Sequence, residues 1–417
     1  MNDKFYSRKL FRQIKPFIDT HDIIVIHGAR QTGKTTLLKM LIQTLPSDDV
    51  YYFDLEDNRL LDVCNDGPDP VVQYLRQKGA LKEQQKFYLI IDEIQYLSNP
   101  SSFLKLLHDH YDYLKLIVSG SSSFAIKSKF KDSLVGRTVN FELYPLDFEE
   151  FLSFKNQTFN LKEKITSKLL INELKKLYTE YVLFGGYPKI VLADSINFKE
   201  TYLQQIIDTY IKSDIRDLAQ IRDISKFNKL LYILASQSGQ LLNVTELANT
   251  TQLARQTIDE YLFILENTYI IKLVTPFSQN IRSELFKKPK IFFYDTGILT
   301  MLRFKMLAKE LTGSVFETSI FSELIKNFND DSIYFWRTHD KKEIDFIISK
   351  QNNMLPIEVK LNAHSLKFTA LKYFHTAYSP PQSFCVSLDG DLKTEKFPIT
   401  NIKPWEILPY ISSSKLN

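Results

Sequence analysis

Glycine is scarce in this sequence: its 417 residues include only 12 glycines, where average usage of about 7% would give about 29. Because glycine accepts positive φ and close backbone contact, we expect the few present to mark positions that exclude a side chain. Cysteine is rarer still. Cys64 and Cys385 stand far apart and outside any C-x-x-C pattern, which argues against disulfides and structural zinc.

Long apolar runs are also missing. No stretch approaches the roughly 18 residues of a membrane span, and the polar N-terminus has no signal-peptide core. These absences predict a cytoplasmic protein without a membrane partner. Apolar residues make up 44% and charged residues 24% of the chain, which excludes a disordered or fibrous protein. The net charge of +4 permits a nucleic-acid partner without requiring one.

Strand-like apolar runs alternate with helical patterns over the first 150 residues, as in a parallel α/β sheet. Helical patterns then dominate up to about residue 240, and the last hundred residues return to a helix followed by strands. We predict an α/β protein of four domains, over residues 1–150, 151–220, 221–300 and 301–417. The predicted strands of the first domain cover residues 23–26, 50–53, 87–91, 116–118 and 139–143.

The loop after the first strand matches the pattern G-x-x-x-x-G-K-[ST], directly before a helical stretch. Its glycines would let backbone N–H groups wrap phosphates at a helix N-terminus. Lys34 would place its charge on the β- and γ-phosphate oxygens, and the Thr35 hydroxyl would ligate Mg²⁺. We therefore predict that ATP and Mg²⁺ bind here. The predicted nucleotide-binding residues are Gly28, Ala29, Arg30, Gln31, Thr32, Gly33, Lys34, Thr35 and Thr36.

A second apolar strand ends in two acidic residues, Asp92 and Glu93. Asp92 would hold Mg²⁺ through water. Hydrolysis also needs a base in line with the γ-phosphate, and Glu93 is placed to polarise the attacking water. The pair therefore completes the residues of a predicted ATP-hydrolysing site.

Residues 22–150 resemble the AAA-type branch of the P-loop ATPases, whose next strand ends in a polar sensor of the γ-phosphate. The resemblance implies this role for Ser119, with Ser121 as its rival. Arg137 follows Gly136 just before the fifth strand, where these ATPases carry an arginine that reaches a neighbouring subunit's nucleotide. A guanidinium supplied in this way stabilises the charge of the transition state, so hydrolysis would depend on assembly.

Residues 242–266 read as two helices around a tight turn, the pattern of a helix-turn-helix. Arg255, Gln256 and Thr257 stand at the exposed start of the second helix, where such proteins contact bases. The following hairpin is basic, as a wing that contacts phosphates would be. Contact with a protein partner is the alternative for both elements. The predicted wing cations are Arg282, Lys287, Lys288 and Lys290.

A hairpin near the C-terminus gathers charge. Its strands would bring Asp345 alongside Glu358, and Glu358 and Lys360 share one face of their strand. Two carboxylates and a lysine on one face are costly unless they serve an ion. We expect Glu343 to face solvent, and Trp336 and Arg337 to serve the core and its support.

This stretch resembles the PD-(D/E)xK restriction-endonuclease-like fold. The resemblance implies that Asp345 and Glu358 ligate Mg²⁺, that Glu317 adds a carboxylate from the preceding helix, and that Lys360 orients the attacking water. The alternative is a degenerate nuclease domain retained for binding DNA or for assembly.

The order of these parts resembles one prokaryotic family along the whole chain. Its members join an AAA-type ATPase core and a helical lid to a winged helix and a nuclease-like domain. The resemblance rests on residues 92–95 (DEIQ), 295–297 (DTG) and 357–360 (IEVK), and residues 185–188 (GGYP) resemble the lid turn. Lys189 stands where many AAA proteins carry a lid arginine.

We therefore expect an ATP-hydrolysing protein that acts on DNA, branched or damaged, as a homo-oligomeric ring or partial ring such as a hexamer. RNA remains a possible substrate. The alternative is a nucleotide-gated signalling or defence switch, in which the winged helix and the nuclease-like domain bind partners without DNA cleavage. A third reading is a nuclease gated by the ATPase.

Overall fold

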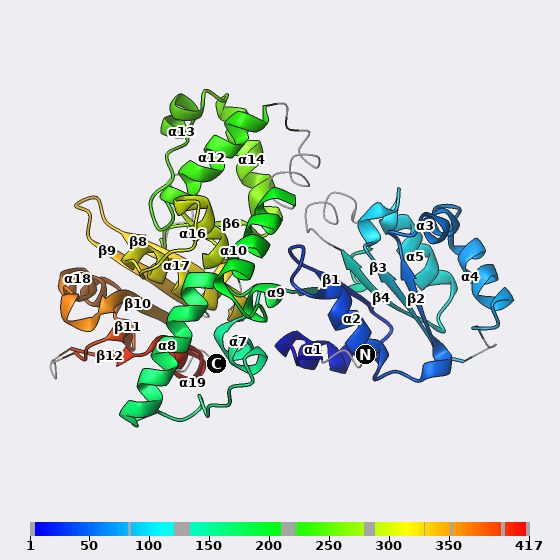
Figure 1. The fold of residues 1–417 in the computed structure, drawn as a ribbon, viewed down its shortest axis with the longest axis horizontal. Coiled ribbons are helices and arrows are strands. Elements are labelled where there is room, and N and C mark those ends of the chain that lie inside the picture. Colours follow the sequence, from blue (N-terminus) through cyan, green and yellow to red (C-terminus); the bar gives the residue numbers. More distant parts are fainter. Residues whose placement is uncertain are drawn as a thin grey trace. The chain divides into compact units, whose positions relative to one another are not determined.

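The chain forms two compact units, which we describe separately in this computed structural model (Figure 1). The first contains Met1–Tyr144 and Asn267–Tyr269, and the second contains Pro145–Glu266 and Ile270–Asn417. Three residues considered above, Ser121, Arg282 and Lys287, lie outside the described part of the chain. The structure describes residues 5–81, 85–120, 134–209, 221, 223–278, 288–328, 330–350, 353–392 and 397–413.

The first unit is built on a parallel sheet of five strands in the order β2-β3-β4-β1-β5. The predicted strands and their parallel arrangement are confirmed. β1, β3 and β4 are buried along their whole length, which is why each reads as an unbroken apolar run. The strands are β1 (Ile23–His27), β2 (Val50–Asp54), β3 (Phe87–Asp92), β4 (Leu114–Gly120) and β5 (Thr138–Glu142).

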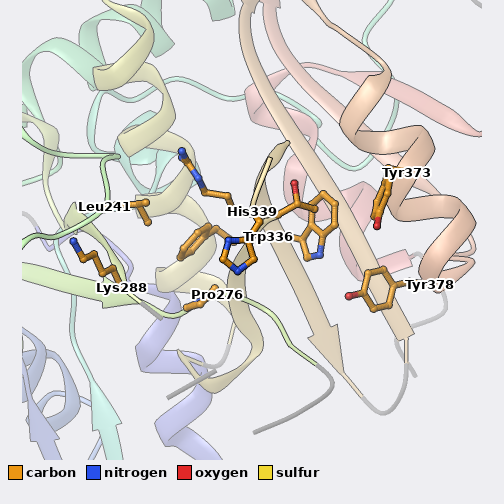
Figure 2. Close-up of a pocket in the computed structure, with 10 residues that line it drawn as sticks. Leu241, Pro276, Lys288, Trp336, His339, Tyr373 and Tyr378 are labelled. Atoms are coloured by element: carbon orange, nitrogen blue, oxygen red, sulfur yellow. The ribbon is translucent and has the colours of Figure 1, made fainter. Parts of the chain in front are cut away.

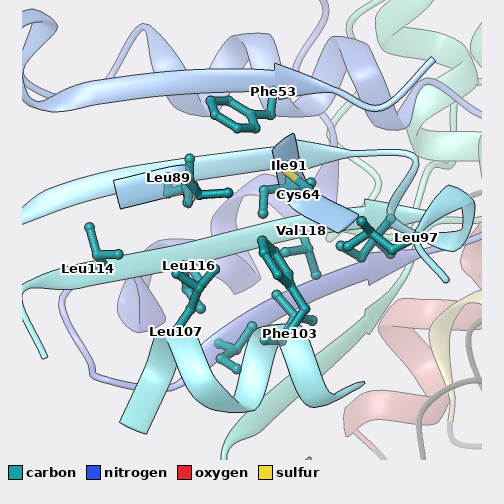
Figure 3. Close-up of a cluster of buried hydrophobic side chains, with 14 of the residues drawn as sticks. Phe53, Cys64, Leu89, Ile91, Leu97, Phe103, Leu107, Leu114, Leu116 and Val118 are labelled. Carbon is teal, nitrogen blue, oxygen red and sulfur yellow. The ribbon is translucent and has the colours of Figure 1, made fainter. Parts of the chain in front are cut away.

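Each face of this sheet has its own hydrophobic core. Alternate residues of a strand point to opposite faces, so Ile23 and Val25 of β1 join one core while Ile24 and Ile26 join the other. The first of these cores lies under α5, whose Phe103 packs among the strands (Figure 3). The helices are α1 (Lys9–Ile14), α2 (Lys34–Ile42), α3 (Asn58–Asn65), α4 (Pro68–Gln77) and α5 (Pro100–His110), with short 3₁₀ turns at Lys15–Phe17, Ser47–Asp49 and Ile94–Tyr96.

The strand order places β1 between β4 and β5. β2, the next strand along the chain after β1, lies toward one edge of the sheet, whereas β5, the next strand after β4, forms the other edge. In open parallel sheets, ligands bind outside the carboxyl ends of the strands where the connections diverge in this way. The loop that begins at Gly28 occupies this position.

The second unit begins with helices. Within it, α13 and α14 are joined by a turn in which Gln252 adopts positive φ (57°), and an antiparallel pair of strands follows. This order of elements is the one predicted for the winged helix. The elements are α7 (Phe148–Phe154), α8 (Lys168–Phe184), α9 (Pro188–Val191), α10 (Ile196–Gln205), α12 (Ile224–Ser236), α13 (Val244–Thr251), α14 (Arg255–Asn267), β6 (Ile271–Val274), β7 (Lys290–Phe293) and α16 (Thr296–Phe304).

A five-stranded mixed sheet completes the second unit, in the order β12-β11-β10-β9-β8. β9 runs antiparallel to both β8 and β10, whereas β11 and β12 run parallel to β10. Helix α17 packs on β10. The elements are α17 (Gly313–Asn327), β8 (Ile333–Arg337), β9 (Glu343–Lys350), β10 (Asn353–Asn362), α18 (Thr369–Tyr378), β11 (Ser383–Asp389), β12 (Ile399–Ile402) and α19 (Ile407–Ser413), with 3₁₀ turns at Asp330–Ser332, Ala363–Ser365 and Pro404–Glu406.

A buried carboxylate explains two of the short motifs of the sequence. Asp295 caps α16 by accepting from Ile298 N at 3.0 Å, and it also accepts from Gly186 N at 2.7 Å. A Cβ built on Gly185 would lie 2.3 Å from its Oδ1, and one on Gly297 would lie 2.2 Å from the Phe184 carbonyl oxygen. The glycine turn after α8 therefore packs tightly against the segment that opens α16, and neither Gly185 nor Gly297 leaves room for a side chain.

Candidate functional site

The loop after β1 has the two glycines that its backbone requires. A Cβ on Gly28 would lie 2.1 Å from the carbonyl oxygen of Leu143. Gly33, the N-cap of α2, has a φ of 97°, which side chains other than hydrogen rarely allow. The loop therefore passes close to the chain beyond β5 and turns sharply into the N-terminus of α2, a backbone shape that presents N–H groups to an anion.

Lys34 lies inside this loop. Its side chain is buried, and its ammonium donates to the carbonyl oxygens of Gly28 at 3.0 Å and Ala29 at 2.9 Å. Burial lowers the pKa of Lys34 to about 8, although the carboxylates of Glu93 and Asp92 favour its charged form. The structure thus brings the predicted phosphate-binding cation to the centre of the loop.

Arg8 holds the loop by hydrogen bonds to the backbone, a role that the sequence did not predict. Its guanidinium is buried and donates to the Thr32 carbonyl oxygen at 2.7 Å and to the Tyr144 carbonyl oxygen at 2.7 Å. One residue thus holds the loop to the end of the sheet. No sequence signal marks it, because its partners are backbone atoms 24 and 136 residues away.

Asp92 is the centre of a hydrogen-bond network at the end of β3. It accepts from the Thr35 hydroxyl at 2.6 Å, from the Tyr52 hydroxyl at 2.9 Å, from the Ser119 hydroxyl and from Glu93 N at 3.1 Å. Burial and the neighbouring Asp92 charge raise the pKa of Tyr52 above its usual range, so its hydroxyl stays a donor. Tyr52 was not predicted, although its place at the end of the neighbouring strand is a usable signal.

Glu93 leaves the strand in a left-handed conformation, with a φ of 56°. Its carboxylate accepts a hydrogen bond from the Gln95 amide, which fixes its orientation beside Asp92. The donor set suits the predicted Mg²⁺ in its chemistry, since the Thr35 hydroxyl and the Asp92 carboxylate are oxygen ligands.

Arg137 does not belong to the loop of its own chain. Its carbonyl oxygen accepts from Ile23 N at 2.7 Å, so its backbone lies at the start of β1, whereas the phosphate loop follows the end of that strand. Its guanidinium pairs with Asp109, with nitrogen–oxygen distances of 2.8 and 3.0 Å. Within one chain, this arginine and the nucleotide site therefore lie at opposite ends of the strands.

The second unit gathers the charges predicted for the nuclease-like site. Ile357 pairs with Phe346, which places Glu358 opposite Asp345. The Lys360 ammonium bridges them, at 3.1 Å from Asp345 Oδ2 and 2.7 Å from Glu358 Oε2. Val359 N donates to Asp345 as well, at 2.7 Å. The predicted carboxylate pair and its lysine are therefore neighbours.

Lys290 requires a correction. It was predicted as a wing cation for phosphates, but its side chain is buried and its ammonium lies 3.2 Å from Glu317 Oε1 and 2.7 Å from Glu343 Oε1. Glu343, expected to face solvent, is partly buried between Lys290 and Arg337. A lysine so enclosed by carboxylates cannot reach a nucleic-acid backbone.

The predicted Mg²⁺ site of Glu317, Asp345 and Glu358 fits the structure poorly. Lysine ammoniums bridge these carboxylates, and among the described residues no group of three or more His, Cys, Asp or Glu side chains is arranged to hold a metal ion. Burial and the nearby Asp345 raise the pKa of Glu358 to about 8 and that of Glu317 to about 7. The protein's own cations and protons balance this cluster.

The start of α14 presents polar side chains, as predicted. Arg255 and Gln256 are exposed and Thr257 is partly exposed, while Ile258 is buried. On the wing, Lys288 is exposed. In the described ranges, no helix is both long enough and apolar enough to cross a membrane.

Comparisons with known proteins agree with the loop geometry. Residues 20–152 match an AAA domain, and together with the parallel sheet this defines the class as that of the AAA-type P-loop ATPases. The rest of the chain matches two domains of unknown function, one (DUF8612) over residues 175–309 and the other (DUF4143) over residues 312–407.

Two relatives show the family. An uncharacterised protein of Methanocaldococcus jannaschii is 30% identical over 355 residues, which cover 84% of this chain and 77% of that protein. An uncharacterised protein of Haemophilus influenzae is 30% identical over 372 residues, which cover 86% of this chain and 88% of that protein. The chain belongs to the family of these proteins.

Similarity to solved structures is weaker. A Walker-type ATPase of Pyrococcus abyssi is 14% identical and gives a TM-score of 0.46, covering 72% of this chain and 97% of that one. AMPPCP-bound DnaA of Aquifex aeolicus is 16% identical and gives a TM-score of 0.28, covering 63% of this chain and 88% of that one. Both scores are too low to establish a shared fold.

Proposed function

We propose that this protein hydrolyses ATP and uses the nucleotide cycle to act on DNA. The observation that carries the proposal is the loop after β1, in which Gly28, Gly33 and the buried Lys34 form a phosphate cradle beside the Asp92 network. The proposed action on DNA is supported by the exposed polar residues at the start of α14 and by the charged cluster of Lys290, Glu317, Asp345, Glu358 and Lys360 in the second unit.

The residues of the nucleotide site each have a defined role in this mechanism. Lys34 binds the β- and γ-phosphate oxygens, and Glu93 orients and polarises the attacking water. Thr35 and Asp92 would hold Mg²⁺, which supplies charge neutralisation on the phosphates. Ser119 and Tyr52 hold the Asp92 carboxylate in one orientation, so that the site needs little rearrangement during the reaction.

Arg137 provides the reason to propose a homo-oligomer. Since its backbone lies at the opposite end of the strands from the phosphate loop, it is placed away from the site of its own chain, and we assign it to the site of a neighbouring subunit. Its guanidinium would leave Asp109 and contact the neighbour's γ-phosphate. A ring or partial ring, such as a hexamer, would bring each Arg137 to the next subunit.

A second candidate function has its own support. The ammoniums of Lys290 and Lys360 lie between the carboxylates of the second unit, which favours a domain that binds DNA or a protein partner without cutting. In that case the chain would be a nucleotide-gated switch. The same ion pairs make Mg²⁺-dependent cleavage of DNA less favoured, and with it a nuclease gated by the ATPase.

The experiment that tests ATP hydrolysis compares two lysines of the same helix. Lys34→Ala should abolish phosphate release, whereas Lys39→Ala, which changes an exposed lysine of α2, should leave it unchanged. A Lys34→Ala protein that hydrolyses ATP at the wild-type rate would remove the ATPase assignment.

Phosphate release measured with a panel of nucleic acids separates the two candidate functions. We expect forked and four-way DNA to stimulate turnover, with binding that weakens as salt rises. Arg255→Ala should reduce this stimulation, and Lys229→Ala on α12 serves as its control. A rate that no DNA or RNA changes would favour the switch.

Cleavage is assayed separately with Mg²⁺ or Mn²⁺ and a labelled DNA junction. Products that persist in both Asp345→Ala and Glu358→Ala would exclude these carboxylates from catalysis.

Subunit assembly is tested by mixing Arg137→Ala protein with Glu93→Gln protein. If Arg137 acts in trans, mixed assemblies recover turnover, because some sites then combine an intact Glu93 with an intact Arg137. Two inactive variants that stay inactive at every mixing ratio would count against a shared site.

A further inference from the structure

A pocket of about 420 Å³ lies within the second unit, between the wing and the sheet (Figure 2). One wall carries Lys288, next to β7. The opposite wall carries Trp336 of β8, and Tyr373 and Tyr378 of α18. The volume is within the range of about 300–1,000 Å³ found for pockets that bind small organic groups. Among the described residues that line the pocket, Lys288 was predicted to contact nucleic acid, and none takes part in the proposed ATP cycle.

Backbone hydrogen bonds join two of the segments that line the pocket, one at Pro276 and the other at Phe335. Phe277 N donates to the Phe335 carbonyl oxygen at 2.6 Å, and Phe335 N donates to the Thr275 carbonyl oxygen at 3.2 Å. These bonds connect the segment after β6 to β8, about sixty residues further along the chain. These two lining segments are therefore held together by the chain's own backbone.

The wall opposite Lys288 is aromatic. The rings of Trp336 and Tyr373 have centroids 5.8 Å apart and are tilted by 34°, and Tyr378 stands almost perpendicular to Trp336 at 6.4 Å. Trp336 is buried, whereas Tyr373 is 51% exposed, and the Lys342 ammonium lies over its ring at 5.1 Å from the centroid. A base that stacks on this ring takes the place of that ammonium. Flat aromatic ligands stack on such surfaces.

The charge of the lining is positive. Lys288 and His339 line the pocket and are exposed. Arg337 also lines the pocket and pairs with Glu343. Asp and Glu are absent from the described residues that line it. The pocket thus combines aromatic rings with cations, which suits a ligand that is planar at one end and anionic at the other.

We propose that this pocket binds one unstacked nucleotide of a single-stranded nucleic acid, with the base on Tyr373 and the backbone phosphate near Lys288 and His339. Stacking on aromatic rings beside cations is how proteins hold single strands without reading their sequence. The pocket also neighbours the charged cluster, because Glu343 pairs with both Arg337 and Lys290. The inference rests on the proposed action on nucleic acid, and it names where a strand is held.

The test uses the full chain and the fluorescence of Trp336. Since the protein has two tryptophans, Trp405→Phe leaves Trp336 as the single reporter. Trp405 is buried and its indole N–H has no hydrogen-bond partner among the described residues, so phenylalanine removes an unsatisfied donor there. We expect a short single-stranded oligothymidylate to quench Trp336. Anisotropy of the labelled oligonucleotide with unaltered tryptophans gives the affinity independently.

Pocket variants then report on the site. Tyr373→Ala should weaken binding of the oligonucleotide about tenfold, and Lys288→Ala should lower the slope of log affinity against log salt by about one. Phe198→Ala removes a ring that is 55% exposed in α10, and Lys168→Ala removes an exposed lysine at the start of α8. Both controls should bind as the wild type does.

The possible outcomes separate the inference from the proposed function. If DNA stimulates turnover and the oligonucleotide binds, but Tyr373→Ala binds like the wild type, the pocket assignment is overturned while the proposed function stands. If thymidine monophosphate quenches Trp336 with the same affinity as the oligonucleotide, the ligand is a free nucleotide and the single-strand assignment is overturned. A wild-type chain that binds no nucleic acid overturns both, while Lys34-dependent ATP turnover can still be measured.

Discussion

Asp92 is the residue on which several hydrogen bonds of the nucleotide site converge. Four donors converge on one carboxylate that is almost fully buried, 2% exposed. A buried carboxylate with all its acceptor positions engaged is held in one orientation, and two of these donors come from other strands. Its neighbours therefore matter for turnover even where they touch no substrate.

Tyr52→Phe tests this at one atom. The change removes the hydroxyl that donates to Asp92 and keeps the ring, and a hydrogen bond to a charged group contributes about 1.5–3 kcal/mol. We expect kcat for ATP to fall about tenfold or more. Tyr51→Phe is the matched control, because the neighbouring hydroxyl bonds to Tyr74 instead. Equal rates for the two variants in a phosphate-release assay would contradict the role given to Tyr52.

Lys34 predicts a pH dependence of nucleotide binding. Burial lowers its pKa to about 8 in the free protein, so the ammonium loses its proton as pH rises through that value. Bound phosphates favour the charged form, and affinity should therefore fall above pH 8 by up to about tenfold for each further pH unit.

The measurement for Lys34 is a titration with a fluorescent ATP analogue between pH 7 and pH 9.5. Lys34→Arg keeps its charge throughout this range, so the profile of that variant should be flat wherever it still binds. A wild-type affinity that does not change across the range would show that Lys34 stays charged in the free protein.

Sequence could predict the ATP site where chemistry and spacing are local. Gly28, Gly33, Lys34 and Thr35 follow one another in a known pattern, and Asp92 ends an apolar strand. Arg8 and Tyr52 have no such pattern, since each acts on a partner brought near only by folding. Lys290 was assigned wrongly for the same reason, because its neighbours in sequence are basic whereas its neighbours in space are carboxylates.

At the scale of elements, Asp295 connects the turn after α8 to the start of α16. It is both an N-cap and the acceptor for Gly186 N, and it is buried. Replacing it with alanine leaves two buried N–H groups without partners, each with a cost of about 1–3 kcal/mol. We expect Asp295→Ala to lower the free energy of unfolding by about 2–4 kcal/mol, measured by urea denaturation.

Asp223→Ala provides the comparison for Asp295→Ala. Asp223 is also an aspartate N-cap, on α12, and it accepts from Lys226 N at 3.0 Å. Loss of a cap alone costs about 1 kcal/mol. Similar losses in the two variants would mean that the bond from Gly186 adds nothing to stability.

The elements were easier to predict than their partners. Apolar runs predicted β1, β3 and β4 because these strands are buried on both faces, and helical spacing predicted α13 and α14. The sequence could place Gly185 and Gly297 in marked stretches without showing that they pack on one aspartate. That relation joins segments more than one hundred residues apart, and local pattern carries no information about it.

At the scale of the whole molecule, the first unit takes three residues from far along the chain. Asn267–Tyr269 are counted with Met1–Tyr144. The Tyr269 ring stacks on His27 at a centroid distance of 6.5 Å, and its hydroxyl donates to Glu142 at 3.1 Å. Although burial raises the pKa of Glu142, the hydrogen bonds from His27, Tyr144 and Tyr269 outweigh it and hold this pKa at about 2.

Tyr269→Ala should therefore weaken the first unit. Because the change removes a buried ring and leaves Glu142 with one donor fewer, we expect a loss of about 3–5 kcal/mol, the range for aromatic truncations. Thermal unfolding with and without ADP identifies the transition of the first unit, since a bound nucleotide raises its midpoint. Tyr96→Ala, at a tyrosine that is 42% exposed, is the control. If both variants melt at the same temperature, Tyr269 contributes no more than a surface residue does.

The return of residues 267–269 to the first unit also bears on how such a chain can be rearranged in evolution. Recombination that joined residues 1–144 to a different C-terminal half would leave Tyr269 behind, with Glu142 and His27 beside the start of the phosphate loop. A new partner half would have to supply an aromatic residue at the matching place. A single crossover between residues 144 and 267 would therefore separate the first unit from the tyrosine that contacts Glu142 and His27.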